Sequence, residues 1–143
     1  MLQLFTQSQL PLFCAARTGE TRIGQSLMLP APQLSLPQLL SQAAAQGCRY
    51  VLLGIPEDIG PRANLGNGGA DQGFAAFLSR FINLQDNGFA KSGELLLAGT
   101  IACADLQQQS QSLDSNDANQ LAQLRALCAE LDLRVSSVLR ACF

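Results

Sequence analysis

The sequence predicts an α/β fold with a parallel sheet, in the order helix, strand, helix, strand, helix. Short apolar runs without alternation, typical of strands buried on both faces, occur at residues 48–54 and 94–104. Segments with a helical period precede, separate and follow these runs. Strands joined by helices through right-handed crossovers lie parallel in one sheet, with helices on its faces.

The first 35 residues are expected to form an irregular N-terminal arm. Pro11, Pro30 and Pro32, many Gln and Ser residues, and the lack of a sustained period argue against long elements there. Residues 36–143 are then predicted to form one partial α/β domain.

The first helix is predicted from about residue 36 to residue 46. Ser35 is a suitable N-cap, and Gly47 offers a C-terminal stop. The apolar run at 48–54 follows directly and is closed by Gly54 and Pro56, which predicts a central parallel strand.

The second helix is predicted from about residue 71 to residue 84, with Asp71 as its N-cap. Its apolar side chains recur at i, i+3, i+4 and i+7, a stripe that would pack on a sheet: Phe74, Phe77, Leu78 and Phe81. The run at 94–104 is the second buried strand.

A polar stretch at residues 105–112 leads into the last helix, for which Ser115 or Asn116 can serve as N-cap. Seven apolar residues form one stripe along it: Leu121, Leu124, Cys128, Leu131, Val135, Val138 and Cys142. A helix that covers a sheet explains this stripe better than a coiled coil, because the flanking positions are not systematically charged. Two strands make a poor sheet with two unpaired edges, so we expect the opening of a larger domain.

Composition excludes several classes of function. Nine basic and eleven acidic residues, with no Lys/Arg run, give no electrostatic basis for nucleic-acid or membrane binding. The first 20 residues lack the basic and apolar regions of a secretory signal, which favours a cytoplasmic location. Five dispersed cysteines are most simply small buried side chains, and the absence of histidine removes imidazole from any active site or metal shell of this chain.

The loop at residues 55–70 carries the strongest functional signal. It is far longer than the roughly 2–6 residues usual for a strand-to-helix connection, and it follows a parallel strand at the end where such sheets bind ligands. Its glycines match neither a P-loop nor the dinucleotide fingerprint, so nucleotide binding is disfavoured. A structural loop packed by its own residues is the alternative.

From Gly54 this segment reads GIPEDIGPRANLGNGGADQGFAAFLSRFINLQDN. It resembles the arginase/agmatinase/formimidoylglutamase (ureohydrolase) superfamily, in its Gly-x-Pro-x-Asp-x-Gly core and the Gly-Ala pair, over about residues 46–104. The form with Glu57, Arg62, Asn64 and the stretch FINLQDN is most similar to the formimidoylglutamase branch. Asn67-Gly68 departs from the Arg and Pro that are more common there.

The resemblance implies an arginase-like fold of three αβα layers, of which this chain would be the N-terminal portion. It also implies two manganese ions that activate a hydroxide, and hydrolysis of N-formimidoyl-glutamate to glutamate and formamide during histidine degradation. The family's metal ligands lie in Gly-Gly-x-His, Asp-x-His-x-Asp and Asp-x-Asp motifs, which this sequence does not contain. We therefore expect a chain that is not catalytically competent alone.

Within this chain the predicted substrate contacts are Arg62, through a substrate carboxylate, and Asn64, through an amide hydrogen bond. A structural salt bridge from Arg62 to Glu57 or Asp58 is the alternative. No catalytic residue and no metal ligand is assigned, because the aspartates are too scattered to replace the missing motifs. A hypothesis from another class is a non-catalytic α/β module that self-associates, as a possible homo-oligomer, or pairs with another chain through its open sheet edge or last helix.

Overall fold

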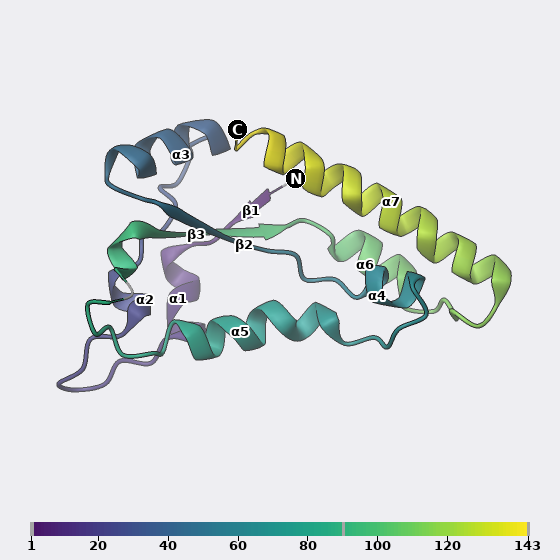
Figure 1. Cartoon of the computed structure of the whole chain (residues 1–143), viewed down its shortest axis with the longest axis horizontal. Helices are drawn as coiled ribbons and strands as arrows, with labels where there is room; N and C mark the ends of the chain where they lie inside the picture. Colours follow the sequence, from purple (N-terminus) through teal and green to yellow (C-terminus); the bar gives the residue numbers. More distant parts are fainter. Residues whose placement is uncertain (1, 90, 143) are drawn as a thin grey trace.

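The computed structural model describes residues 2–89 and 91–142 and shows a mixed α/β fold (Figure 1). In these residues a three-stranded sheet has the order β1-β3-β2, with β1 at Leu2–Leu4, β2 at Tyr50–Gly54 and β3 at Leu95–Ile101. The α-helices are α1 (Leu10–Phe13), α2 (Ile23–Ser26), α3 (Leu36–Ala45), α4 (Ile59–Ala63), α5 (Gly73–Phe81), α6 (Ala104–Ser110) and α7 (Ala118–Arg140). Short 3-10 turns occur at Gln7–Gln9, Ala70–Gln72 and Ser92–Glu94.

The two predicted strands are present and parallel, with Tyr50 paired to Leu95 at the start of the register. The predicted parallel sheet is confirmed for β2 and β3, but the sheet as a whole is mixed, because β1 pairs with β3 in the antiparallel direction. This third strand has only three residues, too few to show a period in the sequence.

The prediction that β2 is the central strand is wrong. The central position belongs to β3, in which Leu96, Leu97 and Ala98 are buried. Tyr50 and Val51 of β2 keep 57% and 47% of their surface exposed. An apolar run without alternation is typical of burial on both faces, but here it belongs to an edge strand whose outer side is unpaired in the described part of the chain.

Helices cover both faces of the sheet (Figure 1). On one face Leu96 and Ala98 of β3 pack against Leu39 and Ala43 of α3, and Leu124, Leu131 and Val138 of α7 pack with Ile101. On the other face Leu97 packs with Leu78 of α5. The last helix therefore covers the sheet through its apolar stripe, as predicted.

Residues 1–35 hold more regular structure than expected, namely β1, α1 and α2. Phe5, Ile23 and Leu27 are buried in the core beside α5. The Met28 backbone also exchanges two hydrogen bonds with β3, to Leu95 at 2.8 Å and from Leu97 at 3.0 Å. Apolar side chains spaced among prolines give no period in the sequence, yet they pack on both faces of the sheet, with Leu27 beside α5 and Met28 in the group that contains α3.

The helix ends show how local chemistry selects boundaries. Ser35 precedes α3 as predicted, and its backbone N–H donates to Oε1 of Gln38 at 3.0 Å. The prediction of Asp71 as N-cap is wrong, since Asp71 lies inside a 3-10 turn that precedes α5. The cap of α7 is Asp117 rather than Ser115 or Asn116, and its Oδ1 accepts hydrogen bonds from the N–H groups of residues 119 and 120.

Helix α6 was not predicted, because only Leu106 and Ser110 of its seven residues are buried and no apolar stripe marks it. The five cysteines are all free, and Cys103 is buried while the other four are half-buried. In the described residues no helix has the length and apolar character needed to cross a membrane.

A glycine in β3 controls the pairing of β1. Gly99 has φ +148°, and a Cβ added there would lie 2.0 Å from the carbonyl oxygen of Gln3. We predict that Gly99→Ala lowers the free energy of unfolding by roughly 1–3 kcal/mol, measured by urea denaturation. The matched control is Gly73→Ala, where nothing lies within 4 Å of the added Cβ; an equal loss in both variants would contradict this role.

Candidate functional site

The carboxyl ends of β2 and β3 lie at the same edge of the sheet, and the segments that follow them meet there. β2 leads into the loop at residues 55–70, and β3 leads into α6. The loop is partly helical, because α4 forms within it and packs against α7 (Figure 1). The buried residues of α4 are Ile59 and Ala63, which are 0% and 4% exposed.

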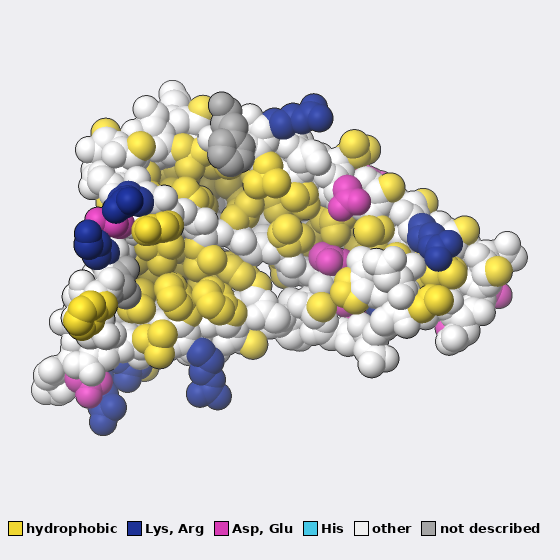
Figure 2. Space-filling view, viewed as in Figure 1, with side chains coloured by type: hydrophobic (Ala, Val, Ile, Leu, Met, Phe, Trp, Pro, Cys, Tyr) yellow, Lys and Arg dark blue, Asp and Glu magenta, His cyan; other side chains and the backbone are white. Residues whose placement is uncertain are grey.

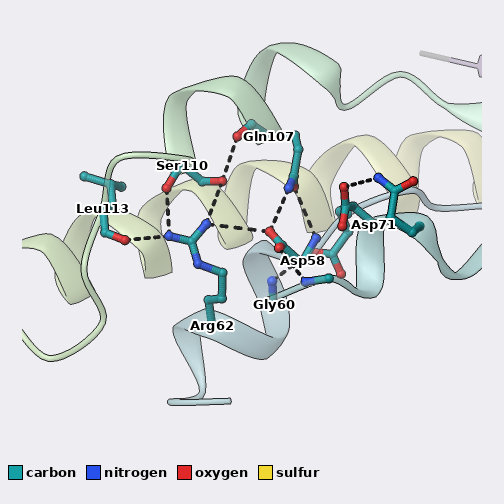
Figure 3. A network of polar contacts seen from close by, with 10 residues as sticks. Asp58, Gly60, Arg62, Asp71, Gln107, Ser110 and Leu113 are labelled. Atoms are coloured by element: carbon teal, nitrogen blue, oxygen red, sulfur yellow. Dashed lines mark hydrogen bonds and ion pairs between the residues drawn. The ribbon is translucent and has the colours of Figure 1, made fainter. Parts of the chain in front are cut away.

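Asp58 is the centre of the polar contacts in this loop (Figure 3). Its Oδ2 accepts a hydrogen bond from the N–H of Gly69 at 2.9 Å, and its Oδ1 accepts one from Nε2 of Gln107 at 2.7 Å. The Asp58 N–H donates in turn to Oε1 of Gln107 at 3.2 Å. Asp58 therefore joins both ends of the loop to α6.

Gly68 is required by the same contact. A Cβ added at Gly68 would lie 2.8 Å from Oδ2 of Asp58, so a side chain there would displace the carboxylate. This explains one glycine of the loop by the close approach of a side chain rather than by its backbone conformation.

Arg62 extends the network to the end of α6. Its Nη1 lies 3.6 Å from Oδ1 of Asp58, and its Nη2 donates to the carbonyl oxygens of Ser110 and Leu113 at 2.9 and 2.5 Å. Nη1 also donates to Oγ of Ser110 at 3.3 Å. The guanidinium thus satisfies carbonyl groups at and beyond the C-terminal end of α6, which have no partner within the helix.

The charge of Asp58 is stabilised despite its burial. Desolvation opposes ionisation, but the hydrogen bonds from Gly69 and Gln107 and the positive charge of Arg62 outweigh it. Together they hold the pKa of Asp58 below the ordinary value of an aspartate. This carboxylate is therefore a negatively charged anchor of the loop.

The two predicted substrate contacts have different surroundings. The Arg62 side chain is only 14% exposed, and its Nη groups point to partners within the chain. Of the two acidic residues that could pair with Arg62, Asp58 makes the ion pair. Glu57 instead accepts a hydrogen bond from the N–H of Gly60 at 2.7 Å. Asn64 is exposed at the end of α4. Contact of either residue with a substrate stays a prediction.

Two adjoining cavities open beside this network. One, of about 190 Å³, is mainly apolar, and Phe5, Phe13, Phe74 and Leu78 are among its lining residues. The other, of about 330 Å³, is lined in part by Cys103, Gln107, Gln108 and Gln111. Gln3, Pro56 and Asp71 line both. The carboxyl-end edge of the sheet therefore borders two hollows, an apolar cavity and a more polar cavity.

The described residues do not fit a binuclear metal centre. No group of three or more Cys, Asp or Glu side chains among them is placed to hold an ion. Both oxygens of Asp58 accept hydrogen bonds, and Asp105 pairs with Arg134 at 2.6 Å, which lowers the pKa of Asp105 to about 2. No manganese step is assigned to residues of this chain.

The sequence reasoning missed Asp71, Gln107 and Ser110 as members of this region. Gln107 and Ser110 lie about fifty residues beyond Asp58 and Arg62, in a helix that shows no apolar period. Searches of family models, curated proteins and solved structures gave no match to this chain.

The Arg62 contacts predict a large structural effect. We expect Arg62→Ala to lower the free energy of unfolding by about 2–4 kcal/mol, because it leaves Asp58 and the two carbonyl groups without their cation. Urea denaturation at neutral pH measures this. The matched control is Arg49→Ala, whose exposed ion pair with Glu94 spans 3.7 Å and should contribute less than about 1 kcal/mol. Equal stabilities of wild type and Arg62→Ala would show that the contacts are not structural.

Proposed function

We propose that this chain is the N-terminal portion of a formimidoylglutamase-like hydrolase of the arginase superfamily, with an arginase-like three-layer fold. Such enzymes use two manganese ions to convert N-formimidoyl-glutamate to glutamate and formamide in histidine degradation. The proposal includes a cytoplasmic location, and it includes the expectation that the chain is not catalytically competent alone.

One observation carries the proposal. The motif GIPEDIGPRANLGNGGA begins at the last residue of β2, and the loop that it forms borders two cavities at the carboxyl end of the parallel strands. Open α/β sheets bind their substrates at that end. Pro56 is the residue of the loop that lines both cavities, and the hydrogen bonds of Asp58 hold the rest of the loop against α6, with Asn64 exposed at the end of α4.

The chemistry of the cavities suits the amidine end of the substrate, whereas its two carboxylates would need cations from outside these two linings. Asp71 is the carboxylate that lines both, and neither lining includes Lys or Arg. A formimidoyl group is basic, and its protonated form would be attracted by a carboxylate rather than repelled. The manganese ions, when bound in the family, supply the activated hydroxide.

The proposal predicts which sequence motifs the gene encodes after residue 143. The DNA downstream of the Phe143 codon should encode a strand that ends in Gly-Gly-x-His, followed by Asp-x-His-x-Asp and Asp-x-Asp motifs. The product of the whole reading frame should release formamide from N-formimidoyl-L-glutamate with Mn²⁺ and leave agmatine intact, whereas residues 1–143 alone should release none. A frame without these motifs, or turnover by residues 1–143 with Mn²⁺, would contradict the proposal.

A second candidate is a non-catalytic module that associates with a second copy of itself. It is favoured by the outer edge of β2, which is unpaired in the described residues and flanked by exposed apolar side chains, namely Tyr50, Val51, Ile55, Phe77 and Leu139. Figure 2 shows apolar side chains gathered over the sheet and the helices on either side of it. An unpaired edge with an apolar surround is a template for strand addition.

This candidate predicts a dimer that one lysine dissociates. Light scattering should give a mass near twice the 15.2 kDa of the chain, and Val51→Lys should reduce it to one chain, because a charge at the edge blocks strand pairing. Leu133→Lys is the control, since Leu133 is 72% exposed on α7, away from β2. A stable wild-type monomer, or dissociation by both variants alike, would exclude association through β2.

A further inference from the structure

Asp71 occupies the junction of the two cavities at the carboxyl end of the sheet. It lines the apolar cavity together with Phe74 and Leu78, and it lines the polar cavity together with Gln107 and Gln111. Among the described residues that line either cavity, Asp71 is the one carboxylate, and none carries a positive side chain. A ligand that spans the junction would therefore meet one negative charge.

The carboxylate of Asp71 is largely free to bind. Its one hydrogen bond among the described residues comes from the neighbouring side chain, as Nε2 of Gln72 donates to Oδ2 at 2.6 Å. Oδ1 accepts none from the part of the chain that is described. Figure 3 shows Asp71 beside the Asp58 network but outside its hydrogen bonds. Asp71 is also half-buried, so water screens its field less than at an open surface.

The polar cavity provides further acceptors. Gln108 and Gln111 of its wall are exposed, and their amide oxygens can accept N–H groups. Gln107 is different, because both ends of its amide already bond with Asp58. Gln107 therefore fixes the wall, while the other two glutamines are available.

The apolar cavity favours a ligand that carries an apolar group beside its charged group. Its walls include the rings of Phe5, Phe13 and Phe74, and about 190 Å³ is enough for a small hydrocarbon group. A cation within reach of aromatic faces gains a further electrostatic attraction. An anion at the same place would be repelled by the carboxylate of Asp71.

We propose that these two cavities form one binding site for a primary ammonium compound with a short apolar body, with Asp71 as its counter-ion. The ammonium group donates to the Asp71 carboxylate and to the glutamine amides, and the apolar body occupies the cavity lined by phenylalanines. This site is the pair of cavities that the proposed function gives to the amidine group, but the binding proposed here needs neither metal nor turnover and is tested without them.

The test compares two small probes on the whole 143-residue chain. Benzylamine carries an ammonium group on a phenyl body, and benzyl alcohol has the same shape without the charge. Titration followed by ¹⁵N–¹H NMR should show benzylamine binding at least about tenfold more tightly than benzyl alcohol, because hydrogen bonds to charged groups are roughly twice as strong as neutral ones. The shifted signals should include those of residues 71–75 and 107–111.

Asp71→Asn should remove the tenfold preference while benzyl alcohol binds as before. The substitution keeps the size of the side chain and disturbs only the contact with Gln72. Asp132→Asn is the matched control, since it removes a carboxylate from the exposed part of α7, outside the cavity walls. Equal binding of the two probes to wild type, no binding of benzylamine, or an unchanged preference in Asp71→Asn would each overturn the proposal. A failed hydrolase test would leave this result unaffected.

Discussion

The fold depends on β3 being buried on both faces and paired on both sides. Leu96 and Ala98 of this strand lie in the core beneath α3, Leu97 lies in the core beside α5, and Ile101 lies in the core with α7. Every group of buried apolar side chains thus contains a residue of this one strand. Its edges are paired with β2 on one side and with β1 and the Met28 backbone on the other, so backbone hydrogen bonds accompany the burial of its side chains. The carboxyl end of β3 is consequently a rigid place from which α6 starts.

Two charged side chains, Asp58 and Arg62, hold the long loop against α6. Ile59 and Ala63 are the apolar side chains that the loop buries, whereas Ile55 and Leu65 stay exposed, so apolar packing holds mainly its helical turn. Asp58 and Arg62 fix the rest, since one accepts hydrogen bonds from Gly69 and Gln107 and the other donates to the carbonyl groups at the end of α6. A loop whose polar side chains have hydrogen-bond partners in the protein is held in one conformation more strictly than a loop whose polar side chains contact only water.

The sequence predicted the elements whose pattern is local and missed those whose partners are distant. The strands at 48–54 and 94–104 and the last helix were recognisable, because runs and stripes of apolar residues repeat over short spans. The order of the strands in the sheet could not be predicted, because nothing in the sequence of β2 shows that β1 pairs with the other edge of β3. The pairing of Arg62 with Asp58 could be foreseen as one option, because residues four apart share a helix face. Its bonds to Ser110 and Leu113 could not, because they depend on how α6 packs after the chain has returned through β3. The sequence predicts Asp71 as a helix cap, whereas it lies in a 3-10 turn and lines both cavities.

The two surfaces that the structure offers for function are physically separate. The unpaired edge of β2 runs along the strand, whereas the cavities around Asp71 lie beyond the strand ends, so association at the edge does not have to cover the cavities. They also differ in chemistry. The edge is apolar with backbone groups to pair, and suits another strand, while the cavities combine one carboxylate with amides and phenyl rings, and suit a small cation. The loop contributes Pro56 to the second surface, so a ligand at the strand ends would contact the end of the loop next to β2 and leave the Asp58 network unchanged. The exposed Tyr50 and Val51 belong to the first surface and line neither cavity, so association and ligand binding make independent demands on the sequence.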